Sequence, residues 1–263
     1  MPIAPAGWSR WDPIPENSTQ ARRVPRGFVV HTFVDGPGPT DLRGYFARAD
    51  VGAESTWVLP RSGKAIQIMD TNVRVDTQVE GNLWYENGVA FGHCSVECED
   101  DGDPEGHPFT EDQIDHLTAM FVWLHAAHGM PLRWMTHPRD AGFGWHSMWG
   151  FADPINLTGG YRTNPWTTSR GKTCPGRTRI GQLVDEVMPR AIEIVSDLED
   201  DMSQYSDQLD RIERRLTRVE DNMLTDRRFQ RWLDDGWKRW TSRITKSFPL
   251  NGWKLAPKEP TGD

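Results

Sequence analysis

The feature that most constrains the fold is the apolar run at residues 27–34, GFVVHTFV. Its β-branched and aromatic residues are typical of a strand buried on both faces. A second strand is predicted at residues 93–99, HCSVECE, where alternation puts Glu97 on the face opposite the cysteines. Glu97 then either lines a cleft or belongs to the solvated face of an edge strand.

Turn and capping signals supply the neighbouring elements. Ser62-Gly63 separates residues 55–61 from residues 64–70, which predicts a hairpin. Thr110 with Gln113 forms a capping-box pattern at the start of an amphipathic helix that Gly129 ends. Strands and helices alternate, so we expect an α/β fold with a mixed central β-sheet flanked by helices, preceded by an extended, proline-rich arm at residues 1–26.

The composition excludes several classes of protein. A net charge of -8 over 263 residues argues against general nucleic-acid binding. The sequence lacks an apolar run of the roughly 18 residues that a transmembrane segment needs. The first residues do not have the basic and apolar regions of a signal peptide, so we expect no signal peptide.

The segment GKTCPG places Cys174 between a lysine and a Pro-Gly turn. A thiolate is a strong zinc ligand, and a catalytic zinc has three protein ligands and one open position. His31 and His146 are the candidate partners, with His137 as a rival to His146. A histidine inside a buried strand is more often a hydrogen-bonded core residue, so His31 depends on the other ligands being present.

The ordered set GFVVHTFV, CSVECED, PFTEDQIDHLTAMFVWLHAAHGMP, GFGWHSMWG and GKTCPG resembles the zinc-dependent N-acetylmuramoyl-L-alanine amidases, which share a fold with peptidoglycan recognition proteins. The resemblance covers about residues 26–190 and is nearest to endolysins of phages that infect actinobacteria. It implies a zinc amidase domain at residues 27–190.

The resemblance also implies roles for single residues. His31, His146 and Cys174 match the three zinc ligands of the family. Glu97 matches the base that deprotonates the zinc-activated water, and Lys172 matches a lysine that stabilises the oxyanion. Two departures are that Ser55-Thr56-Trp57 lacks the tyrosine or histidine of many relatives, and that the loop between His146 and Cys174 is longer than expected.

The C-terminal part is predicted to be a separate appendage. A helix at residues 177–188 is expected to end at Pro189. Apolar residues then recur at alternate spacings of three and four from Val195 to Met223, which predicts a coiled coil at residues 191–224 and a homo-oligomer of undetermined order. The tail at residues 225–263 is rich in aromatic and basic residues, and either folds back on the coiled coil or contacts the cell wall.

The resulting expectation is a phage endolysin that hydrolyses the lactyl–L-alanine amide of bacterial peptidoglycan for host cell lysis. It would stay in the host cytoplasm until it is released to the cell wall. Two alternatives are a non-catalytic peptidoglycan-binding module and a zinc peptidase that cuts the stem peptide. The presence of a cysteine ligand disfavours the first, whereas the ligand set identifies the metal better than the bond that is cut.

Overall fold

The structure is a computed structural model that describes residues 3–4, 7–15, 20–33, 41–101, 107–149, 165–167 and 173–216, together with Asp235 and Lys238. The chain divides into two compact units. One contains Met1–Ala4 and Trp8–Val195, and the other contains Pro5–Gly7 and Ser196–Asp263. The sheet and the candidate site described below lie in the first unit.

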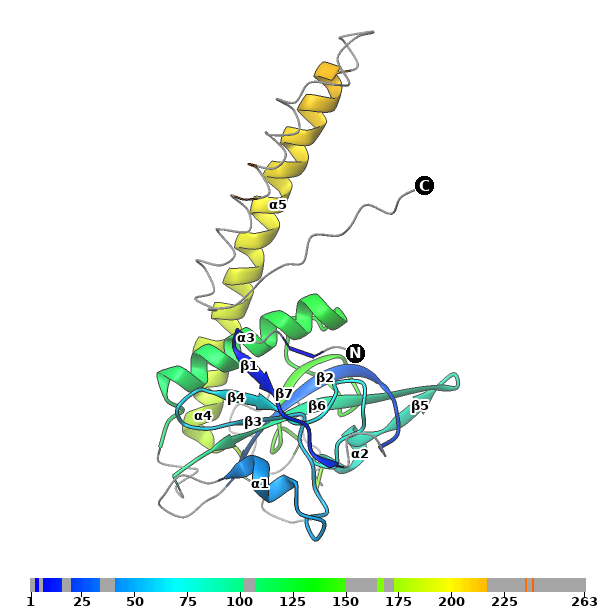
Figure 1. Cartoon of the computed structure of the whole chain (residues 1–263), viewed down its shortest axis with the longest axis vertical. Helices are drawn as coiled ribbons and strands as arrows, with labels where there is room; N and C mark the ends of the chain where they lie inside the picture. Colours follow the sequence, from blue (N-terminus) through cyan, green and yellow to red (C-terminus); the bar gives the residue numbers. More distant parts are fainter. Residues whose placement is uncertain are drawn as a thin grey trace. The chain divides into compact units, whose positions relative to one another are not determined.

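The first unit is built on a 7-stranded sheet with the order β1-β4-β3-β6-β2-β7, to which β5 adds by pairing with β6 (Figure 1). Antiparallel pairs join β3 to β4 and β5 to β6, and the other pairs are parallel. The predicted mixed α/β architecture is therefore confirmed. The strands are β1 (Ser9–Trp11), β2 (Val24–Phe33), β3 (Trp57–Leu59), β4 (Ala65–Gln67), β5 (Trp84–Glu86), β6 (Val89–Glu99) and β7 (Gly142–Trp145).

Strands β2 and β6 form the centre of the sheet. Residues 28–32 of β2 are buried without interruption, which explains why this strand has no polar alternation. The two strands run parallel, with His31 opposite Glu97 and Thr32 opposite Cys98. Because facing residues of a parallel pair project from the same side of the sheet, His31 and Glu97 share one face.

Each face of the sheet packs against helical structure (Figure 1). Helix α3 (Glu111–His128) contacts one face through Phe121, whose ring lies 5.8 Å from that of Phe28 and stacks 4.1 Å from that of Phe143. Helix α1 (Leu42–Phe46) packs on the opposite face, where Phe46 contacts Phe33. Because Phe33 lies two residues after His31 on β2, α1 packs on the same face of the sheet as His31.

The predicted boundaries of α3 are confirmed. Thr110 accepts from the Gln113 amide, and the Gln113 side chain accepts from the Thr110 amide, so both halves of the capping box are present. Gly129 ends the helix in the left-handed conformation, with φ 65°. The predicted hairpin is also confirmed, since β3 pairs antiparallel with β4 around Gly63.

The N-terminal segment contributes to the sheet. Strand β1 pairs in parallel with β4, and the Trp8 ring lies 6.2 Å from that of Trp123 on α3. Residues 24–26, which we predicted as the end of the arm, instead begin β2. The reason is that parallel pairing with β6 extends to Val24 although its side chain is half exposed.

The prediction that Pro189 ends a helix is wrong. Helix α4 (Arg177–Gln182) continues through a π-helical turn, η2 (Leu183–Val187), into α5 (Met188–Leu216). At the junction the Met188 amide donates to the Leu183 carbonyl, one residue farther than in an α-helix. Pro189 directly follows this π-helical turn, and a proline inside a helix removes one hydrogen bond to the preceding turn, so the irregular bonding lies next to the proline while the helix continues.

The coiled coil and the homo-oligomer stay predictions. Helix α5 is described to Leu216, whereas most of the predicted tail and the last positions of the heptad pattern lie outside the described residues. Among the helices that the structure describes, none is long and apolar enough to cross a membrane.

Candidate metal centre

The first two site residues lie on the central strands. The His31 side chain is 2% exposed and that of Glu97 is 12% exposed, so the carboxylate borders solvent and the imidazole does not. His31 Nδ1 and Glu97 Oε1 are 3.6 Å apart. Their closeness follows directly from the register of β2 and β6, which places the two residues opposite each other.

His146 follows the last residue of β7. That strand pairs in parallel with β2 up to Val30, and the His146 amide donates to the Val30 carbonyl at 3.2 Å, which extends the pairing to the ligand itself. The two imidazole rings come to lie 4.3 Å apart. His146 Nε2 lies 3.1 Å from the carbonyl oxygen of Trp166. A carbonyl only accepts hydrogen bonds, so this contact favours the tautomer with the hydrogen on Nε2 and the lone pair on Nδ1.

Cys174 precedes helix α4 and is held from two directions. The Thr32 amide donates to its Sγ at 3.0 Å, and its own carbonyl accepts from the Ser147 amide at 3.0 Å. Buried Arg179 donates to the carbonyl of Pro175 at 3.2 Å and pairs with buried Asp100 at 3.4 Å. These contacts join the Cys174 turn to the ends of β2 and β6 and to the turn after β7.

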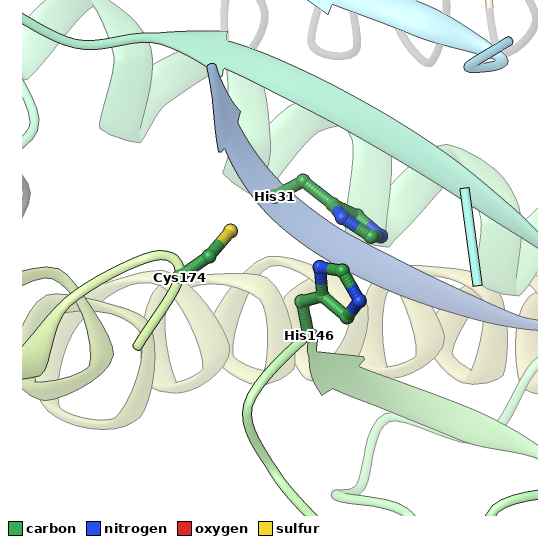
Figure 2. A group of neighbouring side chains, drawn as sticks. All are labelled: His31, His146 and Cys174. Carbon is green, nitrogen blue, oxygen red and sulfur yellow. The ribbon is translucent and has the colours of Figure 1, made fainter. Parts of the chain in front are cut away.

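His31, His146 and Cys174 converge, although they are far apart in the sequence. Each offers one ligand atom, and these atoms lie within 4.8 Å of one another. Figure 2 shows the two imidazoles side by side, with the Cys174 sulfur directed toward them. His137 is exposed and is not part of this group in the described structure. Lys172 lies outside the described residues, so its predicted role stays a prediction.

The donor set fits zinc. Two neutral imidazoles and a thiolate are a frequent ligand set of catalytic zinc, which keeps a fourth position open. Ligand atoms in a tetrahedral zinc site are about 3.4–3.6 Å apart, given bonds of about 2.0–2.3 Å. The observed limit of 4.8 Å therefore requires only a small inward movement of the side chains.

The other two cysteines are unsuitable as ligands. Cys94 and Cys98 are completely buried in β6, and burial raises the pKa of both thiols, that of Cys98 well above the ordinary value. A buried, protonated thiol is neither a nucleophile nor a metal ligand. Cys174, unlike Cys94 and Cys98, is partly exposed.

Sequence reasoning missed Trp166, which contacts His146, and His93, which contacts the ring of Trp166. Trp166 is completely buried and supplies the carbonyl that contacts His146. Its position after Pro165 in a long polar stretch resembles an ordinary loop. His93 begins the predicted strand, and its Nε2 lies 2.9 Å from the carbonyl of Pro138, which also accepts from the Trp166 indole at 3.0 Å.

Burial lowers the pKa of His93 to about 3, which makes stability depend on pH. In the unfolded chain this histidine has a pKa of about 6.5 and is protonated below that pH. In the folded chain it stays neutral down to about pH 3, so the unfolded state binds one more proton between these two values. Stability should thus fall on acidification below about pH 6.5, by about 1.4 kcal/mol per pH unit from this residue. His93→Gln, which keeps a donor for Pro138, should remove that component.

Urea unfolding of the wild type and of His93→Gln between about pH 7 and about pH 5 measures the effect. The difference between the two slopes isolates His93 because the other histidines are the same in both proteins. Equal slopes would show that His93 is protonated without cost in the folded chain.

Comparison with known proteins gives distant likenesses only. No protein-family model matches the chain. No curated protein sequence matches it.

Several solved structures are similar. The N-acetylmuramoyl-L-alanine amidase LysC from Clostridium intestinale is 14% identical, with a TM-score of 0.39 over 69% of this chain and 95% of that one. A mutant endolysin from Bacillus subtilis is 15% identical, with a TM-score of 0.42 over 70% and 96%. The catalytic domain of PlyG is 14% identical, with a TM-score of 0.45 over 70% and 93%. Likenesses this distant do not carry a function from one protein to another.

Proposed function

We propose that the chain is a zinc-dependent N-acetylmuramoyl-L-alanine amidase, an endolysin that hydrolyses the lactyl–L-alanine amide of bacterial peptidoglycan. Residues 27–190 would form the catalytic part. The observation that carries the proposal is the convergence of His31, His146 and Cys174 next to Glu97, whose carboxylate borders solvent. The choice of the peptidoglycan amide rests on the resemblance of the sequence.

Each residue of the candidate site would have a separate role. His31, His146 and Cys174 would hold zinc, which, when bound, supplies an acidified water and a Lewis acid for a carbonyl. Glu97 would take the proton of the attacking water and pass it to the leaving amine. What supports Glu97 is its position 3.6 Å from His31 and its contact with solvent, since a base must reach both the water and the substrate.

Two further residues complete the proposal. Lys172, two residues before Cys174, would stabilise the negative charge that develops on the carbonyl oxygen. Thr32 would hold the Cys174 sulfur in position, because its amide donates to Sγ at 3.0 Å.

The test is digestion of purified peptidoglycan with analysis of the new chain ends. An amidase releases peptides with N-terminal L-alanine and leaves the glycan strands intact. Removal of the metal by a strong chelator should abolish this release, and added zinc should restore it. New amino groups on other residues would instead identify a stem-peptide peptidase. Binding to the wall without any cleavage, by a protein that contains no zinc, would identify a binding module.

A further inference from the structure

We propose that Trp166 is a positioning residue for His146: its carbonyl holds the Nε2 hydrogen, so that Nδ1 faces the metal, and its indole fixes that carbonyl in place. The inference rests on the zinc centre proposed above and adds a residue to it. Twenty positions separate the two residues in the sequence, and no motif connects them.

The carbonyl of Trp166 is a junction between the candidate ligand and helix α2 (Val79–Asn82). It accepts from His146 Nε2 at 3.1 Å and from the Val79 amide at 3.2 Å, while the carbonyl of Pro165 accepts from the Glu80 amide at 3.2 Å. The first amides of a helix have no partner within the helix. Here the carbonyls of Pro165 and Trp166 accept from these amides. The Trp166 oxygen has a second lone pair, which is available for His146.

The indole of Trp166 is locked on several sides. It is completely buried, donates from Nε1 to the Pro138 carbonyl at 3.0 Å, and contacts the rings of Trp149 and His93 at 5.5 Å and 5.6 Å.

Two glycines, Gly81 and Gly144, make room for this ring. A Cβ on Gly81 would lie 3.1 Å from the indole nitrogen, and a Cβ on Gly144 would lie 3.3 Å from the ring edge. These approaches are closer than ordinary van der Waals contacts. The indole therefore packs closely against both glycines, which restricts its movement.

The chemical consequence concerns the tautomer of His146. A neutral imidazole places its hydrogen on either nitrogen unless one of them has an acceptor. The carbonyl of Trp166 selects Nε2–H and orients the ring, which leaves the Nδ1 lone pair toward His31 and Cys174. Partners of this kind are typically worth about 10- to 100-fold in metal affinity.

Two variants test the inference, each with a matched control. Trp166→Phe keeps a buried ring but deletes the donor to Pro138, and its control is Trp57→Phe. The Trp57 indole is equally buried, and its nitrogen has no hydrogen-bond partner among the described residues. Val79→Pro replaces the amide hydrogen that contacts the Trp166 carbonyl with a ring carbon, which displaces that carbonyl. Its control, Val79→Ala, keeps the amide hydrogen. Proline is tolerated at the first position of a helix, and Gln78 before it is already extended.

Zinc affinity is measured by competition with a chromophoric chelator. We expect Trp166→Phe and Val79→Pro to bind zinc about 10-fold or more weakly than the wild type, and both controls to match the wild type. Circular dichroism confirms folding. If Trp166→Phe does not fold, the Val79 pair decides. Affinities equal to those of the controls would overturn the inference.

Nitrogen NMR of the His146 ring in the metal-free wild type gives an independent readout. The expected result is a hydrogen on Nε2. A hydrogen on Nδ1 would overturn the inference whether or not zinc binds. A wild-type protein with Nε2–H that binds no zinc would instead refute the proposed function while upholding the role of Trp166 in setting the tautomer.

Discussion

Replacing Glu97 with glutamine is expected to lower the rate of amide hydrolysis by about 10²- to 10⁴-fold while zinc binding is retained. Glutamine has nearly the same shape as glutamate but cannot accept the proton of the attacking water. His31 keeps a neutral neighbour at the same register position of β6. The measurement is the initial rate of N-terminal alanine release, together with elemental analysis of the purified variant.

Glu99→Gln is the matched control for Glu97→Gln. Glu99 lies two residues farther along β6 on the same face, and its carboxylate accepts from the Arg61 amide at 2.8 Å, a structural contact. We expect this variant to keep nearly the full rate. If both variants are equally slow, general perturbation of the strand explains the loss. If Glu97→Gln is as active as the wild type, the base is another group.

Replacing Cys174 with alanine is expected to remove the metal and with it activity, by about 10³-fold or more. Two imidazoles alone leave zinc with half of a tetrahedral ligand set, and the metal supplies several kcal/mol of charge stabilisation in hydrolysis. The Thr32 amide would also lose its sulfur acceptor. Zinc content after dialysis and the rate of alanine release are the two measurements.

Cys174→Asp and Cys98→Ala separate the ligand role from other effects of losing a cysteine. A carboxylate also binds zinc, so Cys174→Asp should restore part of the metal content and part of the rate. Cys98 is completely buried, and burial raises the pKa of its thiol well above the ordinary value, so Cys98→Ala should keep the zinc. A Cys174→Ala protein with full zinc content would eliminate Cys174 as a ligand.

The parts of the fold that could be predicted are those with strong local signals. The composition of the apolar run around His31 is enough to predict a buried strand. Thr110 and Gly129 specify the two ends of α3 through hydrogen bonds to residues a few positions away. By contrast, β7 is four residues long and half glycine, and it is a strand because it pairs with β2. No local pattern contains that information.

In the candidate site, too, some residues could be predicted from the sequence and others could not. His31, Glu97, His146 and Cys174 could be singled out because their side chains can bind a metal or accept a proton, and because their order along the chain resembles that of a known family. Trp166 acts on His146 through its backbone carbonyl, which every residue has. The sequence of a loop does not reveal which of its carbonyls will face a ligand, so this contact required the structure.

The parallel arrangement of β2, β6 and β7 has a consequence for folding. His31 and Glu97 lie on β2 and β6, His146 directly follows β7, and Cys174 joins them from a turn still farther along the chain. An unfolded polypeptide therefore offers the ion no comparable set of donors. Zinc would bind almost exclusively to the finished sheet, and the free energy of its binding would add to the stability of the native state.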